Sequence, residues 1–368
     1  MVKWELCYSR SFPSLLAIGV LHLGQRLISD GSLAFLTVAG NFPEGAPMAG
    51  TNHRFVETNG IRMHAAEQGE GPLVILCHGF PECWYSWRHQ LPALAAAGYH
   101  AVAPDQRGYG ETDRPEPIEA YHILHLTADM VGLVHALGET RAIIVGHDWG
   151  APVAWHCTLL RPDLFTGVAL LSVPYIQRSW SDPRPTEMMR LLAGEQQFYQ
   201  LYFQEPGKAE AELEADVRVS LATFLYSASG DPPPERRWRF LFGKSERFLD
   251  SGTVPETLPP WLTEQDLDVF TAAFEHSGFR GGLNWYRNLD RLWELTRCLC
   301  GAQLRQPSLF IAGALDGVIT MYRSAFDALE DTMPRLRRKV LLPDAGHWIQ
   351  QERPAEVNRL LIEFLAGL

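Results

Sequence analysis

The sequence is poor in cysteine and carries more acidic than basic residues. Six cysteines occur in 368 residues, and no Cys-x-x-Cys pair is present, so neither a disulfide framework nor a zinc cluster is indicated. Lys and Arg number 32 against 43 Asp and Glu, a net charge of -11, which leaves no basic excess for binding nucleic acid or an anionic membrane. We expect an acidic cytoplasmic enzyme without metal or cofactor, either a monomer or a homodimer.

The chain also lacks an apolar run long enough to cross a bilayer. The most apolar stretch near the start, residues 12–24 (FPSLLAIGVLHLG), is short of the roughly 20 residues that a membrane helix needs, and Pro13 and His22 interrupt it. Glu5 stands where a secretory signal carries positive charge. We expect a buried segment, with a helix at a membrane surface as the alternative. Residues 1–50 are therefore an N-terminal extension of unclear role.

From His53 onward the pattern is that of an α/β domain. Two extended runs joined by Asn59-Gly60 predict a β-hairpin. Six short, continuous apolar runs follow, and helical patterns such as YHILHLTADMVGLVHALG lie between them: PLVILCHG, HAVAPD, RAIIVGHD, GVALLSVP, SLFIAGALD and KVLLPDAGH. Runs of this kind are typical of strands buried on both faces of a parallel sheet. The alternation predicts a doubly wound sheet.

The strand-helix alternation stops in one long segment. Residues 175–304 are rich in helical and aromatic patterns and are broken by SDPRP and GDPPPE. We interpret this segment as a helical cap over the carboxyl ends of the strands, where open α/β sheets bind ligands. The α/β core is then divided between residues 51–174 and 305–368.

The segment GHDWG places an aspartate at a tight turn from strand to helix. Gly146 and Gly150 would allow strand and helix to approach closely, which forces the side chain of Asp148 into the site. This is the spacing of a nucleophile elbow, in which serine is the more familiar central residue. The plainer interpretation is an Asp that caps the following helix, since Asp is a favoured N-cap residue.

Two later segments supply partners for Asp148. In hydrolases with such an elbow, an acid follows a late strand and a histidine follows the last one. SLFIAGALDG ends at Asp316, and KVLLPDAGHW reaches His347. Each residue alone fits a loop, but three positional matches together favour a catalytic triad.

A fourth element is the HGFP segment after an earlier strand. The backbone N–H of Phe80 could pair there with that of Trp149 to form an oxyanion hole. As an isolated motif, HGFP is also compatible with a simple turn. Its position after a strand of the predicted sheet supports the functional interpretation.

These motifs together resemble those of a known family. HGFPECWYSWRHQ, DQRGYGETDRP, GHDWGA, YQLYFQEPG, SGFRGGLNWYRN and DAGHW resemble an epoxide hydrolase of the α/β-hydrolase fold, similar to the hydrolase domain of soluble epoxide hydrolase. The resemblance covers roughly residue 53 to the carboxyl end. It implies a mostly parallel eight-stranded sheet with helices on both faces and a helical cap.

The resemblance also implies two cap tyrosines that donate protons to the opening epoxide. One matches Tyr286 in NWYRN. Tyr199 and Tyr202 compete for the other place, and the tyrosine that precedes Gln-Leu in the family's motif falls on Tyr199. Without the resemblance, both would be taken as aromatic core residues of helices.

An aspartate nucleophile suits an alkyl carbon better than a carbonyl. Its carboxylate is ionised at neutral pH, with an ordinary pKa of about 4, so it can displace an alkyl-oxygen bond and form an ester. Attack on an ester carbonyl would give an anhydride, which argues against esterase or peptidase activity. His347, held by Asp316, would then activate water to hydrolyse the enzyme ester.

Two alternatives remain open at this point. A haloalkane or fluoroacetate dehalogenase would share the Asp nucleophile, but the apolar Phe80 and the single Arg107 of DQRGYG depart from those families. A non-catalytic small-molecule receptor on the same fold would be expected to lose a triad member or a cap tyrosine, and all are present. Function follows from the site and not from the fold.

Neighbouring residues have plainer roles. His147 is expected to pack beside the elbow, and Asp105 is expected to fix its own loop by hydrogen bonds. Trp149, Phe80, Phe203 and Trp285 are predicted walls of an apolar pocket. Such a pocket favours a small lipophilic epoxide, with water as the second substrate.

Overall fold

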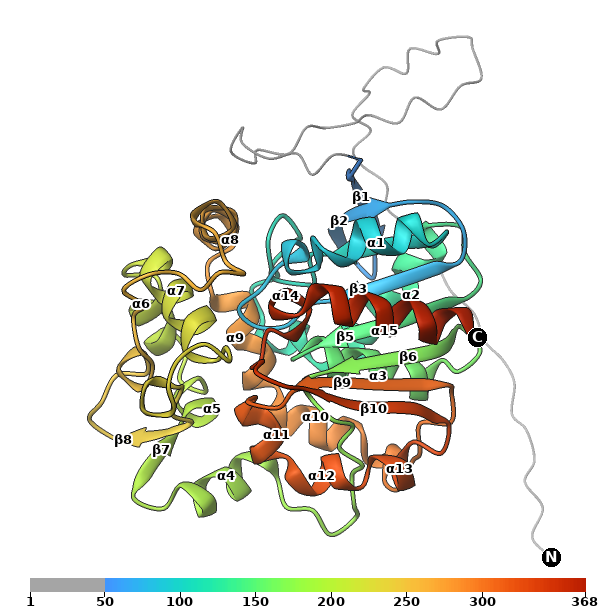
Figure 1. Cartoon of the computed structure of the whole chain (residues 1–368). Coiled ribbons are helices and arrows are strands. Elements are labelled where there is room, and N and C mark those ends of the chain that lie inside the picture. Colours follow the sequence, from blue (N-terminus) through green and yellow to red (C-terminus); the bar gives the residue numbers. More distant parts are fainter. Residues whose placement is uncertain (1–49) are drawn as a thin grey trace, which may run out of the picture. The chain divides into compact units, whose positions relative to one another are not determined.

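A single large sheet forms the centre of the computed structural model, which describes residues 50–368. Neighbouring strands follow the order β1-β2-β4-β3-β5-β6-β9-β10 (Figure 1). The strands are β1 (Asn52–Thr58), β2 (Ile61–Gln68), β3 (Leu73–Cys77), β4 (His100–Pro104), β5 (Ala142–His147), β6 (Phe165–Leu171), β9 (Ser308–Gly313) and β10 (Leu336–Leu342). Pairing is antiparallel for β1–β2 and β2–β4 and parallel for the rest. The prediction of a mostly parallel eight-stranded sheet is confirmed.

The sheet begins with the predicted hairpin. β1 and β2 pair in register from Asn52 opposite Glu67 to Thr58 opposite Ile61. The two turn residues, Asn59-Gly60, have φ angles of 44° and 76°, as a two-residue hairpin turn of type I′ requires. The hairpin is therefore a consequence of these two residues and of the extended runs on either side.

The central strands are buried along their whole length. Every residue of β3, β5 and β9 is buried, as the continuous apolar runs predict. β10 differs, because only Leu342 of its seven residues is buried. β10 is the last strand of the sheet, and charged side chains on an exposed edge discourage pairing with another chain. The expectation of burial on both faces was wrong for this strand.

Helices cover both faces of the sheet. α1 and α15 lie on one face, and α2 and α3 lie on the other (Figure 1). The helices of this layer are α1 (Gln90–Ala96), α2 (Ile123–Ala136), α3 (Gly150–Leu160), α11 (Gly317–Met321), α12 (Arg323–Asp327), α13 (Leu329–Thr332), α14 (Ile349–Glu352) and α15 (Pro354–Ala366). Short 3₁₀ turns are η1 (Trp84–Trp87), η2 (Ile118–Tyr121), η3 (Pro234–Arg236), η4 (Leu249–Ser251) and η5 (Arg297–Leu299).

The last helix shows why the sequence forms this layer. α15 begins with Pro354, whose fixed φ suits the first helical turn. Its buried residues recur at helical spacing along one stripe, and they are Val357, Leu360, Leu361, Phe364 and Leu365. That stripe packs α15 onto the sheet.

The segment between β6 and β9 is helical, as its sequence predicts. Its helices are α4 (Pro185–Ala193), α5 (Tyr199–Tyr202), α6 (Lys208–Leu213), α7 (Val217–Ser227), α8 (Glu264–Ser277), α9 (Arg280–Arg287) and α10 (Leu289–Leu295). A two-stranded antiparallel sheet of β7 (Gln196–Phe198) and β8 (Leu241–Gly243) is also present. This small sheet was not expected, because three-residue strands leave no recognisable periodicity.

No helix within residues 50–368 is long and apolar enough to cross a membrane. The apolar run at residues 12–24 lies outside the described residues. Its two interpretations, a buried segment and a membrane-surface helix, therefore stay predictions.

A buried ion pair joins residues 175–304, called the cap segment below after the predicted cap, to the sheet layer. Arg88 Nε, just after η1, lies 3.0 Å from Asp266 Oδ1 on α8, and their side chains are 4% and 12% exposed. Burial alone would raise the pKa of Asp266, but the charge of Arg88 and hydrogen bonds from Thr263 hold it below its ordinary value. Both members of the pair are therefore charged, and each belongs to a different part of the fold.

We predict that Arg88→Met lowers the free energy of unfolding by about 3–5 kcal/mol, because it leaves the buried carboxylate of Asp266 without its cation. Arg218→Met is the matched control. Arg218 pairs with Glu264 and Asp268 of α8, the helix that carries Asp266, but the side chain of Arg218 is 38% exposed. A loss of at most about 1 kcal/mol in the free energy of unfolding is therefore expected. Urea unfolding of both variants measures the difference, and equal losses would contradict the prediction.

Candidate active site

Asp148 occupies a strained turn between β5 and α3. Its φ is 48°, a left-handed conformation that costs a non-glycine residue about 1–2 kcal/mol. The flanking glycines have no room for a side chain. A Cβ on Gly146 would lie 2.0 Å from the carbonyl oxygen of Gly150, and a Cβ on Gly150 would lie 2.0 Å from that of Cys77. The close packing of strand and helix thus requires both glycines and lifts Asp148 out of the sheet.

Asp148 does not cap the helix that follows it. Trp149 is the N-cap residue of α3 and makes no side-chain capping bond. Instead, the Phe80 N–H, in the loop after β3, donates to Asp148 Oδ1 at 2.9 Å. The carboxylate therefore faces the HGFP loop through Oδ1.

Asp316 and His347 meet Asp148 although they are far apart in the chain. Asp316 follows β9 and caps α11, where its Oδ1 accepts from the Val318 N–H at 2.9 Å. His347 lies in the loop between β10 and α14. Its Nδ1 is 3.2 Å and 3.3 Å from the two Asp316 oxygens, and its Nε2 is 3.4 Å from Asp148 Oδ2. All three predicted residues come together at the carboxyl ends of their strands.

The two carboxylates dominate the electrostatics of this cluster. Burial favours a neutral imidazole, but Asp316 and Asp148 together raise the pKa of His347 well above its ordinary value. Burial also acts to raise the pKa of Asp148, yet the hydrogen bond and charge of His347, with the Phe80 N–H, hold it below its usual value. In this state, Asp148 is an anion beside an imidazolium.

Two tyrosines from the cap segment face the same cavity as Asp148. Tyr199 begins α5 and Tyr286 lies on α9; their ring centroids are 6.1 Å apart. Burial, together with nearby phenols and Asp148, raises the pKa of both well above the usual value, so both keep their protons at neutral pH. Tyr202, the competing residue, donates its hydroxyl to Glu212 at 2.7 Å and does not line the cavity.

The cavity has a volume of about 840 Å³ and is mainly apolar. Trp149 lines it and Phe80 does not, and neither do Phe203 and Trp285. Both are buried one layer behind: the Phe203 ring packs 5.0 Å from that of Tyr286, and Trp285 donates its indole N–H to the Arg107 carbonyl. The prediction that these two and Phe80 form pocket walls is therefore corrected. The Phe203 ring instead packs against Tyr286, and the Trp285 ring packs against Trp149 beside the elbow.

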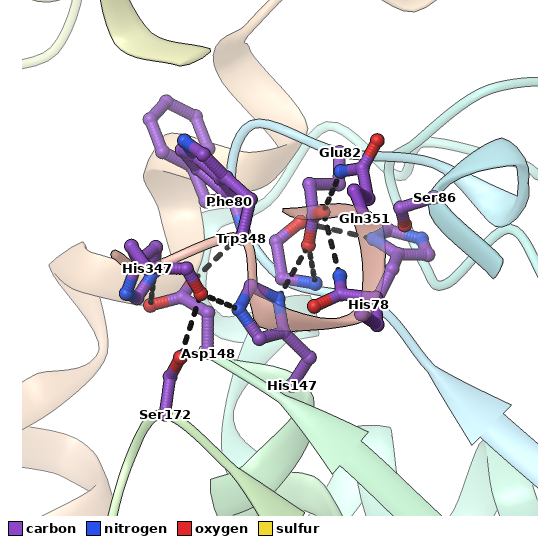
Figure 2. A network of polar contacts seen from close by, with 12 residues as sticks. His78, Phe80, Glu82, Ser86, His147, Asp148, Ser172, His347, Trp348 and Gln351 are labelled. Atoms are coloured by element: carbon purple, nitrogen blue, oxygen red, sulfur yellow. Dashed lines mark hydrogen bonds and ion pairs between the residues drawn. The ribbon is translucent and has the colours of Figure 1, made fainter. Parts of the chain in front are cut away.

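A buried polar network lies behind the predicted triad (Figure 2). His147 Nδ1 is 2.7 Å from Glu82 Oε2, and His147 Nε2 is 2.7 Å from the His347 carbonyl oxygen. The Ser172 hydroxyl donates to the same carbonyl at 2.7 Å. The expected packing role of His147 thus includes hydrogen bonds from both ring nitrogens.

Glu82 connects this network to the HGFP loop. Its Oε2 accepts from the Gly79 N–H at 3.1 Å, and its Oε1 accepts from the side-chain amides of Gln350 and Gln351. Burial acts to raise the pKa of Glu82, but the paired His147 holds it below its ordinary value. One carboxylate thereby links the loop of Phe80 to the backbone of His347.

Sequence reasoning missed Glu82 and Ser172. The available signal was an acidic residue directly after HGFP, since a charged residue in an otherwise apolar and aromatic segment needs a buried partner. Asp105 fits its expectation, because it accepts from the Trp84 and Glu111 N–H groups. Within residues 50–368, no cluster of His, Cys, Asp or Glu is arranged to hold a metal ion.

The sheet, the elbow and the cluster of Asp148, Asp316 and His347 define an α/β hydrolase with an aspartate in the nucleophile position. The family model described as the alpha/beta hydrolase fold matches residues 72–248. The chain is 49% identical over 323 residues to epoxide hydrolase A of Mycobacterium tuberculosis, an alignment that covers 87% of this chain and 99% of the relative. The chain belongs to the epoxide hydrolases.

Solved structures agree with this assignment. An epoxide hydrolase from an endophytic Streptomyces has a TM-score of 0.84 and 52% identity, and the match covers 87% of this chain and 96% of that one. Epoxide hydrolase A from Mycobacterium thermoresistibile has a TM-score of 0.82 and 51% identity, covering 86% and 99%. Each alignment covers most of residues 50–368 and most of the related structure.

We predict that Glu82→Gln lowers the free energy of unfolding by about 1–3 kcal/mol, because one of its buried hydrogen bonds is lost. Turnover should fall about tenfold to a hundredfold, since the His347 backbone and the Phe80 loop would no longer be held together. Denaturation and steady-state kinetics measure the two effects.

Glu116→Gln serves as the control for charge removal. The Glu116 side chain is 88% exposed and pairs with Arg280 at the surface, so its stability should stay within about 0.5 kcal/mol of the wild type. If Glu82→Gln matched this control in both measurements, the network would have no role in holding the site.

Proposed function

We propose that this epoxide hydrolase converts lipophilic epoxides and water to vicinal diols through a covalent ester on Asp148. The observation that carries the mechanism is the placement of one ionised carboxylate and two protonated phenols around the same apolar cavity. Residues 175–304 would act as the cap over a core of residues 51–174 and 305–368.

The first step joins the substrate to the enzyme. Asp148 Oδ1 is engaged by the Phe80 N–H, so Oδ2 is the oxygen that attacks an epoxide carbon. The C–O bond of the ring breaks as the ester bond forms, and its electron pair stays on the ring oxygen. Tyr199 and Tyr286 stabilise that alkoxide by hydrogen bonds, and one of them gives it a proton.

The second step releases the diol. Once Asp148 is an ester, it no longer carries the negative charge that raises the pKa of His347. The imidazolium therefore gives up its proton, which returns to the tyrosinate left by the first step, and the neutral imidazole can act as a base. His347, oriented by Asp316, takes a proton from water as the water attacks the ester carbonyl. The Phe80 and Trp149 N–H groups hold the resulting oxyanion. Its collapse breaks the bond from the carbonyl carbon to the diol oxygen, which takes the proton from His347, and the Asp148 carboxylate is restored.

The donors opposite Asp148 favour an epoxide over a haloalkane. A departing halide needs no proton, whereas an alkoxide does, and protonated phenols supply one. Phe80 offers the cavity no side-chain donor for a halide. A receptor without catalysis would not need the combination of Asp148, Asp316 and His347.

We predict that a single turnover in oxygen-18 water gives a diol without label, because the added oxygen comes from Asp148. The label should instead enter the carboxylate of Asp148, which mass spectrometry of the digested enzyme detects. Later turnovers then transfer it to product. Label in the first diol formed would mean that water attacks the epoxide directly.

The variants Asp148→Ala and His347→Gln separate the two steps. Asp148→Ala should form neither ester nor diol from a simple aryl epoxide, whereas His347→Gln should form the ester and hydrolyse it slowly. Retained turnover in Asp148→Ala would refute the mechanism.

We also predict that the ester accumulates as the pH is lowered from about 8 to 5, a range around the ordinary imidazole pKa of about 6.5. The pKa of Asp148 is depressed, so the nucleophile stays ionised in this range. Protonation of His347 in the ester state removes the base, so hydrolysis slows first. Quenched-flow mass spectrometry across the pH range tests this order, and loss of ester formation before hydrolysis would contradict it.

A further inference from the structure

His156 is a buried histidine that lines the same cavity as Asp148, and the mechanism above assigns it no role. It is 5% exposed. It lies six residues after Gly150, the first residue of α3, which is about 9 Å along the helix axis. The mainly apolar cavity therefore has a polar group at a distance from the proposed nucleophile.

The hydrogen bonding of His156 determines which ring nitrogen carries the proton. Its Nδ1 is 2.7 Å from the carbonyl oxygen of Pro152, one turn earlier on α3. A carbonyl oxygen only accepts, so Nδ1 must donate. Burial lowers the pKa of His156 to about 4, so the imidazole is neutral at pH 7. A neutral imidazole has a single N–H, and Nε2 is therefore an acceptor.

That acceptor has no donor in the described part of the chain. Within residues 50–368, no hydrogen bond reaches Nε2 of His156. Tyr175 and Thr296, which also line the cavity, each donate their hydroxyls to backbone carbonyls elsewhere. Because Nδ1 is turned to its own helix, Nε2 lies on the edge of the ring that faces away from the α3 backbone. A buried acceptor without a donor costs free energy, which a donor on a ligand would recover.

The surroundings of His156 favour a donor without charge. Burial is the main cause of its lowered pKa, and neither a carboxylate nor a cation of the described residues contributes to the shift. A cationic group on a ligand would therefore be buried there without a counter-ion, which is unfavourable. A hydroxyl group supplies the proton without that cost.

We propose that Nε2 of His156 accepts a hydrogen bond from a hydroxyl group of the substrate. The preferred substrate is then a lipophilic epoxide with a hydroxyl at the far end of an apolar linker, roughly 9 Å from the ring. The apolar lining of the cavity suits the linker. This inference rests on the proposed function, because it names the class of epoxide that the same cavity accepts.

Three substrates with the same linker distinguish a donor from general polarity. The first ends in a hydroxyl, the second in a methyl group, and the third in a methyl ether, which has an oxygen but no proton to donate. For the wild type, the KM of the hydroxyl substrate should be about threefold to tenfold below the other two, as one net hydrogen bond predicts. The kcat values should be similar, because the hydroxyl is remote from the reacting carbon. Halving the linker should abolish the preference.

Variants of His156 test whether this residue is the acceptor. His156→Phe keeps a ring and removes both nitrogens, so its KM values for the three substrates should no longer differ. In His156→Gln, the amide can donate to the Pro152 carbonyl and offer its own oxygen to the cavity. That variant should retain part of the preference.

Thr158→Val is the matched control on the same helix. The Thr158 hydroxyl also donates to a carbonyl one turn earlier, that of Ala154 at 2.7 Å, but Thr158 does not line the cavity. Its replacement removes the same kind of bond to the helix backbone as His156→Phe does. Thr158→Val should therefore keep the wild-type KM for each of the three substrates.

Three results would overturn the inference while leaving the proposed function intact: equal KM values of the wild type for the hydroxyl and methyl substrates, a methyl ether that matches the hydroxyl, or a preference that persists in His156→Phe. A wild-type enzyme that forms no ester with any of these epoxides would overturn the proposed function and this inference with it. Steady-state kinetics and mass spectrometry of the trapped ester distinguish these cases.

Discussion

The close approach of two backbone segments determines the position of Asp148. Gly150 packs against the carbonyl of Cys77 at the end of β3, and Gly146 packs against the turn itself. With no room for a Cβ at either position, the chain reverses at Asp148 in a left-handed conformation. The side chain then projects from the carboxyl end of the sheet toward the Phe80 N–H. His347 contacts Asp148 at this position, and Asp316 contacts His347.

In the proposed mechanism, the charges around Asp148 would let His347 act as a base in the second step and not in the first. Asp316 and Asp148 raise the pKa of His347, while His347 in turn depresses that of Asp148. The free enzyme therefore favours an ionised nucleophile beside an imidazolium, which suits attack on an epoxide. Esterification removes one of the two negative charges. In the proposed mechanism, the chemistry of the first step thus prepares the base for the second.

Much of the fold followed from local patterns in the sequence. The Asn59-Gly60 turn and the continuous apolar runs predicted the hairpin and the buried strands, and the glycine spacing around Asp148 predicted the elbow. Position in the sheet decided the failures. β10 ends in the apolar run that predicted an inner strand, but it lies at the edge of the sheet, and its basic residues Arg337, Arg338 and Lys339 suit that exposed position.

Short motifs predicted which residues would meet near Asp148, but they could not predict how the neighbouring side chains are oriented. Tyr199 and Tyr286, the predicted proton donors, line the cavity. Their aromatic neighbours Phe203 and Trp285 do not, because α5 and α9 turn different sides toward it. Glu82, His147 and Ser172 meet from three segments distant in sequence. Their contacts depend on tertiary packing, so the sequence alone could not reveal that they act together.

Aromatic packing connects the two halves of the proposed reaction. The ring of Tyr286 lies 5.1 Å from that of Trp149 and 5.5 Å from that of Phe80, near-perpendicular contacts of the kind that stabilise aromatic pairs. The same two residues carry the proposed oxyanion donors on their backbones. The apolar side chain of Phe80 therefore has a use that a polar donor would not serve. In the proposed mechanism, it would fix the distance between Tyr286 and the carbonyl oxygen of the ester on Asp148.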